Sequence, residues 1–266
     1  MTRKIKTELY NDNFQNYKRY NIPRAQLVIA DIPYNLGVNA YASSTEWYIG
    51  GDNKNGESAK AGKPFFNTDT NFKIAEYMHF CSRMLIKEPK APGKAPAMIV
   101  FCSFEQMSTV IAYGKKYGFH KSYPLFFVKN YSAQVLKANM KIVGATEHAV
   151  VLYRNKLPKF NNDGKMVFNW MEWRRDGKEI LKIHPTQKPV VLLKRLIEIF
   201  TDEGDTVIDP VAGSASTLRA AAELNRNGYG FEIDRGICHK AMEQMLGKVI
   251  HATQPNDPIE SQTRLY

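Results

Sequence analysis

The chain has 266 residues, of which 44% are hydrophobic and 24% are charged. That composition can form one large apolar core and excludes a wholly disordered chain. No run approaches the roughly 18 uninterrupted apolar residues of a membrane-spanning helix, and no apolar signal-peptide segment follows the basic start. We therefore expect a cytoplasmic protein without membrane contact. Three widely spaced cysteines offer no zinc framework, so we expect no metal site.

Lys and Arg number 37 against 26 Asp and Glu, which gives a formal net charge of +11. Such an excess fits a polyanionic partner, although solubility alone would explain it equally well. One stretch, 115–141, contains lysines and no acidic residue, with basic side chains at Lys115, Lys116, Lys121, Lys129, Lys137 and Lys141.

Short apolar runs alternate with helical patterns along the chain. Strands are predicted at 26–30, 97–101, 123–128, 148–153, 206–209 and 228–232, and helices at 71–85, 105–117, 189–200, 216–225 and 235–249. The succession of strand, helix and strand implies parallel pairing. The expected fold class is therefore α/β, a three-layer α/β/α sandwich with a mostly parallel sheet.

Two segments do not fit this alternation. Residues 36–70 form a long loop rich in Gly, Asn, Ser and Lys, and a loop of that length is usually either functional or disordered. Residues 154–182 hold Trp170, Trp173 and eight basic residues. This insert is typical of a recognition surface, but a solvated hairpin over a small core would have the same composition.

Two stretches follow predicted strands at the end where open α/β sheets bind ligands. The first is Asp31-Ile32-Pro33-Tyr34, which would also serve as an ordinary structural turn. The second, 205–216, contains small residues that let a ligand approach the backbone, and the start of the following helix favours a carboxylate. Glu232 ends the next strand, where an acid can hold both ribose hydroxyls of a nucleoside. The G-x-G-x-x-G fingerprint is absent, which disfavours NAD.

A third stretch, 184–189, precedes a strongly apolar helix. Taken alone, this stretch is explained as the start of that helix, with Pro189 near the first turn and Thr186 as the cap. That interpretation explains the prolines but not the grouping of His184, Thr186, Gln187 and Lys188.

Taken in chain order, DIPY from Asp31, HPTQKP from His184 and DPVAGSAST from Asp209 resemble the motifs of the amino-methylating DNA methyltransferases, in the permuted group called beta. The resemblance spans most of the chain. It implies a Rossmann-like fold in circularly permuted order, with S-adenosylmethionine as the cofactor. It also implies a catalytic half at 1–153, a small target-recognition insert at 154–182, a cofactor-binding half at 183–250 and a tail at 251–266.

The same resemblance implies roles for individual residues. Asp31, Ile32, Pro33 and Tyr34 would be catalytic. The weak match of Asn11-Asp12-Asn13 to a GD-containing element near the cofactor adenine adds Asp12 to the cofactor site. The implied cofactor-binding residues are Asp12, Asp31, His184, Thr186, Gln187, Lys188, Asp209, Pro210, Ala212, Gly213, Ser214 and Glu232.

Three residues depart from the family pattern. Ile32 replaces a proline but keeps the main-chain carbonyl, and Val211 replaces a phenylalanine, which should loosen the packing beside the cofactor. Ala215 replaces the second glycine of the cofactor loop. Alanine is tolerable there if the backbone is not left-handed.

The resemblance implies that Asp31 and the Ile32 carbonyl accept the two hydrogens of an exocyclic amine, while Tyr34 stacks on a base flipped out of duplex DNA. Asp at the first position resembles the adenine N6 methylators. The alternatives are a cytosine N4 methylator, a non-catalytic DNA-binding subunit, and the same chemistry on RNA or protein.

Duplex DNA is the expected partner, with a second copy of the chain and a cognate restriction endonuclease as further candidates. Contacts to DNA are expected from the insert, through Arg154, Lys165, Arg174 and Arg175. The lysines of 115–141 are the alternative DNA-binding surface.

Overall fold

The structure is a computed structural model that describes residues 5–34, 72–131, 134–137 and 142–247. The predicted loop at 36–70 and the predicted tail at 251–266 lie outside the described residues. The strands are β1 (Thr7–Tyr10), β2 (Leu27–Asp31), β3 (Ala97–Phe101), β4 (Lys121–Lys129), β5 (Gln134–Lys137), β6 (Ile142–Gly144), β7 (Thr146–Tyr153), β8 (Trp170–Trp173), β9 (Thr206–Asp209) and β10 (Asn227–Phe231). The helices are the 3-10 helix η1 (Phe14–Arg19), α2 (Ile74–Met84), α3 (Met107–Lys116), α4 (Val190–Phe200), α5 (Ser216–Glu223), α6 (Arg235–Lys240) and the π-helix η4 (Ala241–Leu246).

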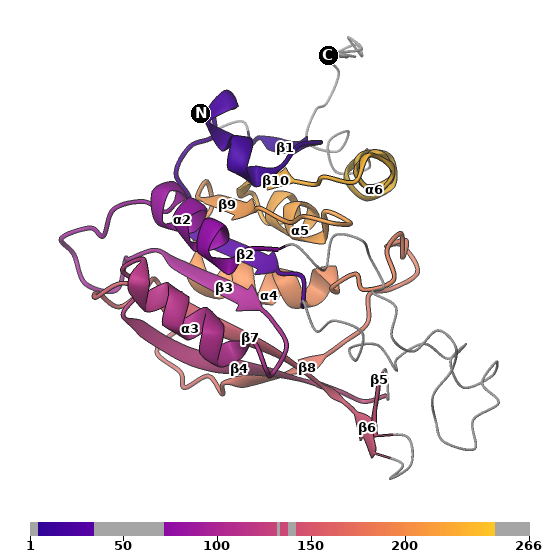
Figure 1. Ribbon diagram of the computed structural model, residues 1–266, viewed down its shortest axis with the longest axis horizontal. Helices are drawn as coiled ribbons and strands as arrows, with labels where there is room; N and C mark the ends of the chain where they lie inside the picture. The colour runs from indigo at the N-terminus through magenta and orange to yellow at the C-terminus, as the bar shows by residue number, and fades with distance from the viewer. Residues whose placement is uncertain (1–4, 35–71, 132–133, 138–141, 248–266) are drawn as a thin grey trace.

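Eight strands form one sheet in the order β1-β10-β9-β2-β3-β7-β4-β8, and β5 pairs with β6 in a separate hairpin. The strands from β1 to β3 in this order are parallel, β7 is antiparallel to both neighbours, and β8 is parallel to β4. Figure 1 shows that strands from the two ends of the chain are interleaved, because β10 and β9 lie between β1 and β2. The sheet is therefore complete only when both halves of the chain are present.

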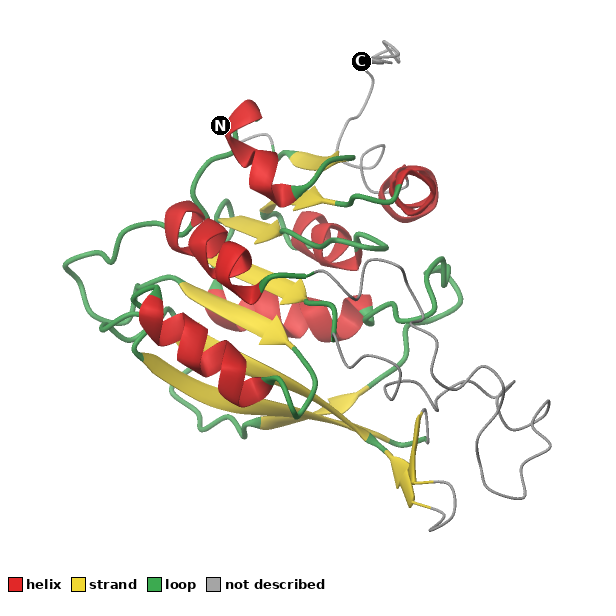
Figure 2. Cartoon of the chain, in the orientation of Figure 1, coloured by secondary structure: helices red, strands yellow, loops and turns green. Residues whose placement is uncertain are grey.

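Helices cover both faces of the sheet (Figure 2). Successive residues of a strand point to opposite faces, so Leu27 and Ile29 pack in one buried cluster while Val28 and Ala30 pack in the other. The first cluster contains residues of α4, α5 and η4, and the second contains residues of η1, α2 and α3. This arrangement confirms the predicted three-layer α/β/α sandwich. Within the described residues, no helix has the length and apolarity needed to span a membrane.

All six predicted strands and all five predicted helices form, with ends that shift by a few residues, and the last predicted helix continues as the π-helix η4. The sequence analysis missed β1 and β8, the two edge strands of the sheet. Both are four residues long and mostly half-buried or exposed, so neither has the continuous apolar run of a buried strand. The predicted insert thus contributes a strand, β8, to the main sheet.

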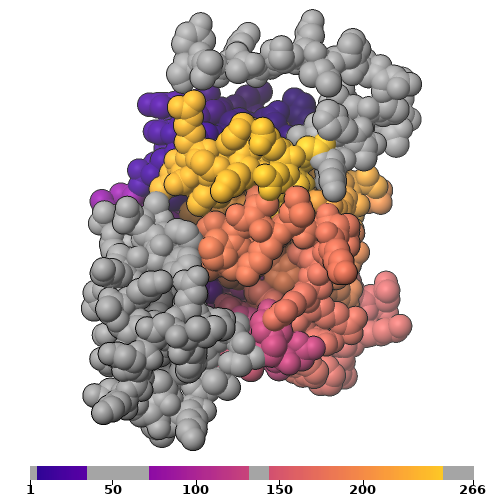
Figure 3. All heavy atoms as spheres, turned by 90° about the vertical axis from the view of Figure 1, so that its right-hand side faces the viewer, coloured from indigo at the N-terminus to yellow at the C-terminus, as the bar shows by residue number. Residues whose placement is uncertain are grey.

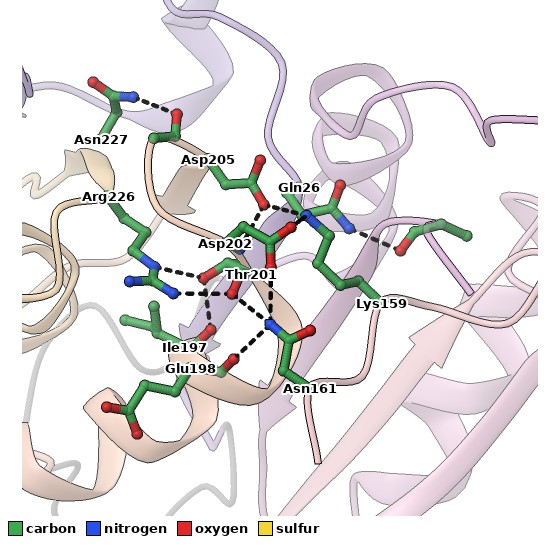
Figure 4. A network of polar contacts seen from close by, with 12 residues as sticks. Gln26, Lys159, Asn161, Ile197, Glu198, Thr201, Asp202, Asp205, Arg226 and Asn227 are labelled. Atoms are coloured by element: carbon green, nitrogen blue, oxygen red, sulfur yellow. Dashed lines mark hydrogen bonds and ion pairs between the residues drawn. The ribbon is translucent and has the colours of Figure 1, made fainter. Parts of the chain in front are cut away.

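A polar network ties the start of the insert to the cofactor-binding half (Figure 4). The Lys159 ammonium lies 2.7 Å from carboxylate oxygens of both Asp202 and Asp205. The Asn161 side-chain amide donates to the main-chain carbonyl of Thr201 at 2.9 Å, and Arg226 donates to the same carbonyl at 3.0 Å. These contacts are made next to the start of β9, at the edge of the sheet opposite the carboxyl ends of the parallel strands.

Candidate active site

The residues singled out from the sequence gather at one edge of the sheet, the edge formed by the carboxyl ends of the parallel strands. Asp31 ends β2, Asp209 ends the neighbouring β9, and Glu232 follows β10. The helix after β2 packs on one face of the sheet and the helix after β9 on the other, which makes this point a topological switch where α/β sheets bind ligands. Figure 3 shows the molecule from the side toward which these strands point in Figure 1. In this view the residues that follow β7, coloured orange, lie beside α6, coloured yellow.

Asp31 forms an ion pair with Lys188, whose ammonium lies 2.5 Å from Oδ2 of the carboxylate. Lys188 also lies over the aromatic rings of Phe101 and Trp173, at 5.4 and 5.8 Å from the ring centroids. Burial alone would lower the pKa of Lys188, but Asp31 and the nearby Glu147 outweigh burial and raise it. Lys188 is therefore a charged partner of the Asp31 carboxylate, whereas the sequence resemblance implies a place in the cofactor site.

The other oxygen of Asp31, Oδ1, is buried and has no hydrogen-bond partner among the residues that the structure describes. Burial raises the pKa of Asp31, while the charge of Lys188 opposes that rise. Because an unpaired buried carboxylate oxygen costs free energy, such an atom indicates a place for a donor from outside the described residues. An exocyclic amine is a donor of the required kind.

Tyr34 and Glu147 extend this site. The Tyr34 hydroxyl donates a 3.0 Å hydrogen bond to Oε2 of Glu147, and Lys129 pairs with Oε1 at 2.5 Å. Burial would raise the pKa of Glu147, but Lys188 and Lys129 reverse the effect and lower it. The sequence analysis missed Glu147, because one acidic residue at the start of a strand carries no local signal of function. It also counted Lys129 among the DNA-binding candidates, which is wrong because its side chain is buried in this ion pair.

The loop after β3 also supports the tetrapeptide Asp31-Ile32-Pro33-Tyr34. The Gln106 side-chain amide donates to the main-chain carbonyl of Pro33 at 2.9 Å, and its carbonyl accepts from the backbone N–H of Ser103. Ile32 is buried in the core, and its N–H donates to the carbonyl of Phe101. Core packing thus holds the position where the family has its proline.

The predicted cofactor loop connects β9 to α5 and contacts Glu232. The backbone N–H of Gly213 donates to Oε2 of Glu232 at 2.8 Å, and the N–H of Asp234 donates to Oε1. Gly213 has a φ of +50°, and apart from its two chain neighbours no described residue has an atom within 4 Å of the position that a Cβ would occupy. The loop therefore leaves the backbone open beside the Glu232 carboxylate, as the binding of a nucleoside there requires.

Other predicted members of the cofactor site form the loop itself. Asp209 is buried, which raises its pKa to about 7, and its Oδ1 accepts from the N–H of Val211. Ser214 is buried, and its hydroxyl lies 2.8 Å from that of Ser216. Pro210 and Ala212 belong to the same turn. The structure brings these residues to the predicted edge, where Asp209 and Ser214 make hydrogen bonds to neighbouring residues of the chain.

Alanine at position 215 is expected to be tolerable only if its backbone is not left-handed, and the structure does not fulfil that condition. Its φ is 59° and its ψ is 24°, a left-handed conformation that glycine adopts readily and alanine adopts at a cost. The condition under which alanine would be tolerable here is therefore not fulfilled. This strained residue is the N-cap of α5, at the end of the cofactor loop.

Asp12 lies beside Glu232 because β1 pairs with β10. Its carboxylate accepts hydrogen bonds from Asn13, Asn16 and Tyr20, and so holds the chain around η1. The neighbouring Asn11 contacts the residue that follows β10, donating to the main-chain carbonyl of Glu232 at 2.9 Å.

The turn at 184–189 is held mainly by its own side chains. Gln187 accepts from the N–H of Ile183 and donates to the carbonyl of Leu181, while the Thr186 hydroxyl lies 3.0 Å from Nδ1 of His184. Burial and the charge of Lys188 lower the pKa of His184.

The predicted capping of α4 by Thr186 is wrong. Asp176 of the insert accepts from the N–H groups of Val190 and Val191, at 2.9 and 3.0 Å, and so caps this helix from a distant part of the chain.

The four DNA-binding candidates of the insert do not lie together. Arg154 donates to the main-chain carbonyls of Ser82 and Ile86, at the edge of the sheet away from Asp31, which removes it from the expected DNA surface. Lys165 belongs to a tight turn before β8, also on that side. Arg174 and Arg175 follow β8 at the Asp31 edge, and the Arg175 guanidinium lies 3.7 Å from the ring centroid of Tyr131.

Comparison with known proteins decides the family. A family model described as DNA methylase, for N6 and N4 methyltransferases, matches residues 25–243. The chain belongs to this DNA methylase family. The match confirms the resemblance inferred from DIPY, HPTQKP and DPVAGSAST.

One relative and two solved structures are similar over most of the chain, and two further relatives are similar over a shorter part of it. DNA adenine methyltransferase YhdJ of Escherichia coli is 27% identical over 250 residues, which cover 86% of this chain and 79% of YhdJ. Two shorter matches, with a methylase of Escherichia coli and a type II methyltransferase of Haemophilus influenzae, cover only 66% and 33% of those proteins. The M1.HpyAVI–SAM complex shares the fold with a TM-score of 0.62 and 20% identity, covering 90% of this chain and 98% of that one. The cytosine-N4-specific PvuII methyltransferase also shares it, with a TM-score of 0.63, 14% identity and coverage of 94% and 93%.

The methyl donor of this family is S-adenosylmethionine. The residues present fit it, because the turn at Gly213 is open and the Glu232 carboxylate stands beside that turn. The unpartnered Asp31 oxygen lies on the neighbouring strand of the same edge.

Proposed function

We propose that this protein methylates the exocyclic N6 amino group of adenine in duplex DNA. The observation that carries the proposal is that the two oxygens of the Asp31 carboxylate have different surroundings. Lys188 holds one oxygen, and the other is buried with no hydrogen-bond partner in the described part of the chain, so it can accept a hydrogen bond. An acceptor held in this way suits an amine that must be oriented for attack.

The reaction needs help because the lone pair of an exocyclic base amine is delocalised into the ring. Asp31 Oδ1 and the Ile32 carbonyl accept its two hydrogens, which leaves the lone pair free to attack. S-adenosylmethionine supplies an electrophilic methyl group when it is bound. Lys188 keeps Asp31 ionised as the amine gains positive charge. Tyr34 stacks on the flipped base and offsets part of the few kcal/mol of unstacking.

Two observations favour adenine. Asp at the first position of the tetrapeptide resembles the adenine methylators, and YhdJ, which is named a DNA adenine methyltransferase, aligns with 86% of the chain. The fold shared with the cytosine-N4-specific PvuII enzyme keeps cytosine N4 as the second candidate. Acceptors arranged in this way suit either amine.

The test is to incubate the protein with S-adenosylmethionine and unmethylated genomic DNA, then to digest the DNA and quantify modified nucleosides by mass spectrometry. We expect N6-methyladenine. We expect Asp31→Ala to reduce its formation by on the order of 10²–10³-fold, a typical loss for one preorganised hydrogen-bonding group. Binding of S-adenosylmethionine, measured by calorimetry, should survive with some loss of affinity.

A matched control is Glu203→Ala, which removes an exposed acid at the opposite edge of the sheet and should leave the rate unchanged. N4-methylcytosine as the product would replace the proposal with the second candidate. A folded Asp31→Ala protein with near wild-type turnover would remove Asp31 from the site.

A further inference from the structure

We propose that Glu147, supported by Lys129, is a positioning residue that fixes the orientation of Tyr34 for stacking on the target base. The inference rests on the proposed function and assigns a role to a residue outside the DIPY, HPTQKP and DPVAGSAST elements. Glu147 reaches the site from β7, on the far side of β3 from β2.

The two oxygens of the Glu147 carboxylate have separate partners. Oε2 accepts from the Tyr34 hydroxyl at 3.0 Å, and Oε1 is paired with the Lys129 ammonium at 2.5 Å. The Lys129 side chain is 9% exposed and that of Glu147 is 21% exposed, so water competes little for either group. A phenol held at its hydroxyl by a fixed acceptor can no longer swing freely about its Cα–Cβ bond, which presets the position of its ring.

Stability alone does not explain such a pair. Burying a lysine and a glutamate costs desolvation, and well-packed apolar residues at such positions are often at least as stabilising. The arrangement is understandable if the glutamate must present its second oxygen to Tyr34 with little freedom. Lys129 then serves to hold the acceptor in place.

The same contacts reach the insert. The Lys129 ammonium lies 4.8 Å from the ring centroid of Trp173, the last residue of β8, and Arg174 and Arg175 follow directly. Trp173 is buried and packs edge-on against Phe127. A continuous set of contacts therefore runs from the catalytic ring of Tyr34 through Glu147 and Lys129 to the segment proposed to contact DNA.

The test is a double-mutant cycle between Glu147→Ala and Tyr34→Phe, read by single-turnover methyl transfer to genomic DNA. Glu147→Ala should slow transfer about tenfold, since it leaves a buried hydroxyl without its acceptor. It should leave the affinity for S-adenosylmethionine, measured by calorimetry, unchanged within about twofold. In the Tyr34→Phe background, where the hydroxyl is already gone, the same substitution should cost less than about twofold.

Glu147→Gln is the conservative variant, because it keeps an oxygen acceptor for Tyr34 while losing the charge. It should fold as the wild type does and recover part of the rate that Glu147→Ala loses. Effects that add in the double variant, an unchanged rate in Glu147→Ala, or a parallel fall in cofactor affinity would each overturn the proposed role. If the wild-type protein transfers no methyl group to DNA, the proposed function fails as well. If it does and only the cycle is additive, the function stands without this role for Glu147.

Discussion

At the scale of single residues, Asp31 must stay ionised in a place that disfavours its charge. Burial raises its pKa, and the nearby Glu147 raises it further, while Lys188 is the cation that opposes both. The charge of Asp31 in turn contributes to the raised pKa of Asp209, the buried acid at the end of the adjacent strand. If the proposed function holds, the pH range in which the protein is active therefore depends on Lys188.

Lys188→Met should move the acidic limb of the rate–pH profile to higher pH. The sign follows from the charge: without the ammonium the pKa of Asp31 rises, so the carboxylate is protonated, and activity disappears, at a higher pH than in the wild type. The measurement is the single-turnover rate across pH. Lys194→Met, on the surface of α4 and paired with Glu223, is the control and should keep the wild-type profile. An acidic limb that does not move in Lys188→Met would show that Asp31 does not set it.

At the scale of elements, the turn between β9 and α5 contains strain that one substitution can remove. Ala215→Gly should raise the free energy of unfolding by about 1 kcal/mol, because glycine adopts the left-handed conformation at no steric cost. For a chain of this size, thermal denaturation should show an increase in Tm of roughly 2–4 °C.

The control for this prediction is Ala221→Gly within α5, where glycine should instead lower the stability by about 1 kcal/mol. A lower Tm for Ala215→Gly would mean that the surrounding loop, rather than the alanine, determines this conformation.

Most elements were predictable because buried strands and amphipathic helices leave local patterns. The strand at 97–101 is an example, since its five residues are all buried and form one apolar run. Asp31, Gly213 and Glu232 could be placed because they follow such strands. The cap of α4 by Asp176 could not be predicted, because it joins residues 14 positions apart without helical or strand spacing. The Tyr34–Glu147 contact spans 113 positions and depends on the order of strands in the sheet.

At the scale of the whole molecule, basic residues that were grouped in the sequence are divided between two edges of the sheet. Arg174, with a side chain 73% exposed, and Arg175 are at the edge that carries Asp31, whereas Arg154 and Lys165 are at the other. DNA that presents a flipped base to Asp31 would pass the first pair. The insert therefore has one end suited to DNA contact and one end that anchors it.

The double substitution Arg174→Ala and Arg175→Ala should weaken DNA binding and reduce its dependence on salt. An arginine that neutralises one phosphate contributes about 0.9 to the slope of log K against log salt, so its removal should lower the slope by that amount. If either arginine instead contacts a base, its variant should relax the preferred sequence by roughly 1–3 kcal/mol. Fluorescence anisotropy at several salt concentrations distinguishes these effects.

Lys165→Ala is the matched control, since it removes one basic side chain at the opposite edge and should bind DNA as the wild type does. Unaltered affinity, salt dependence and specificity in the double variant would transfer the DNA-binding role to the lysines of 115–141 other than Lys129.

The alternation of strands from the two ends of the chain affects how the protein is made on the ribosome. Among the described strands, β1 pairs with β10 alone, and β2 has only β3 until β9 has been synthesised. Until then the nascent chain carries an open, apolar edge at β2, the kind of edge to which other chains add. A stalled or truncated chain that ends before β9 should therefore aggregate or be degraded rather than persist as a half-domain, so premature termination would yield no DNA-binding fragment able to compete with the intact enzyme.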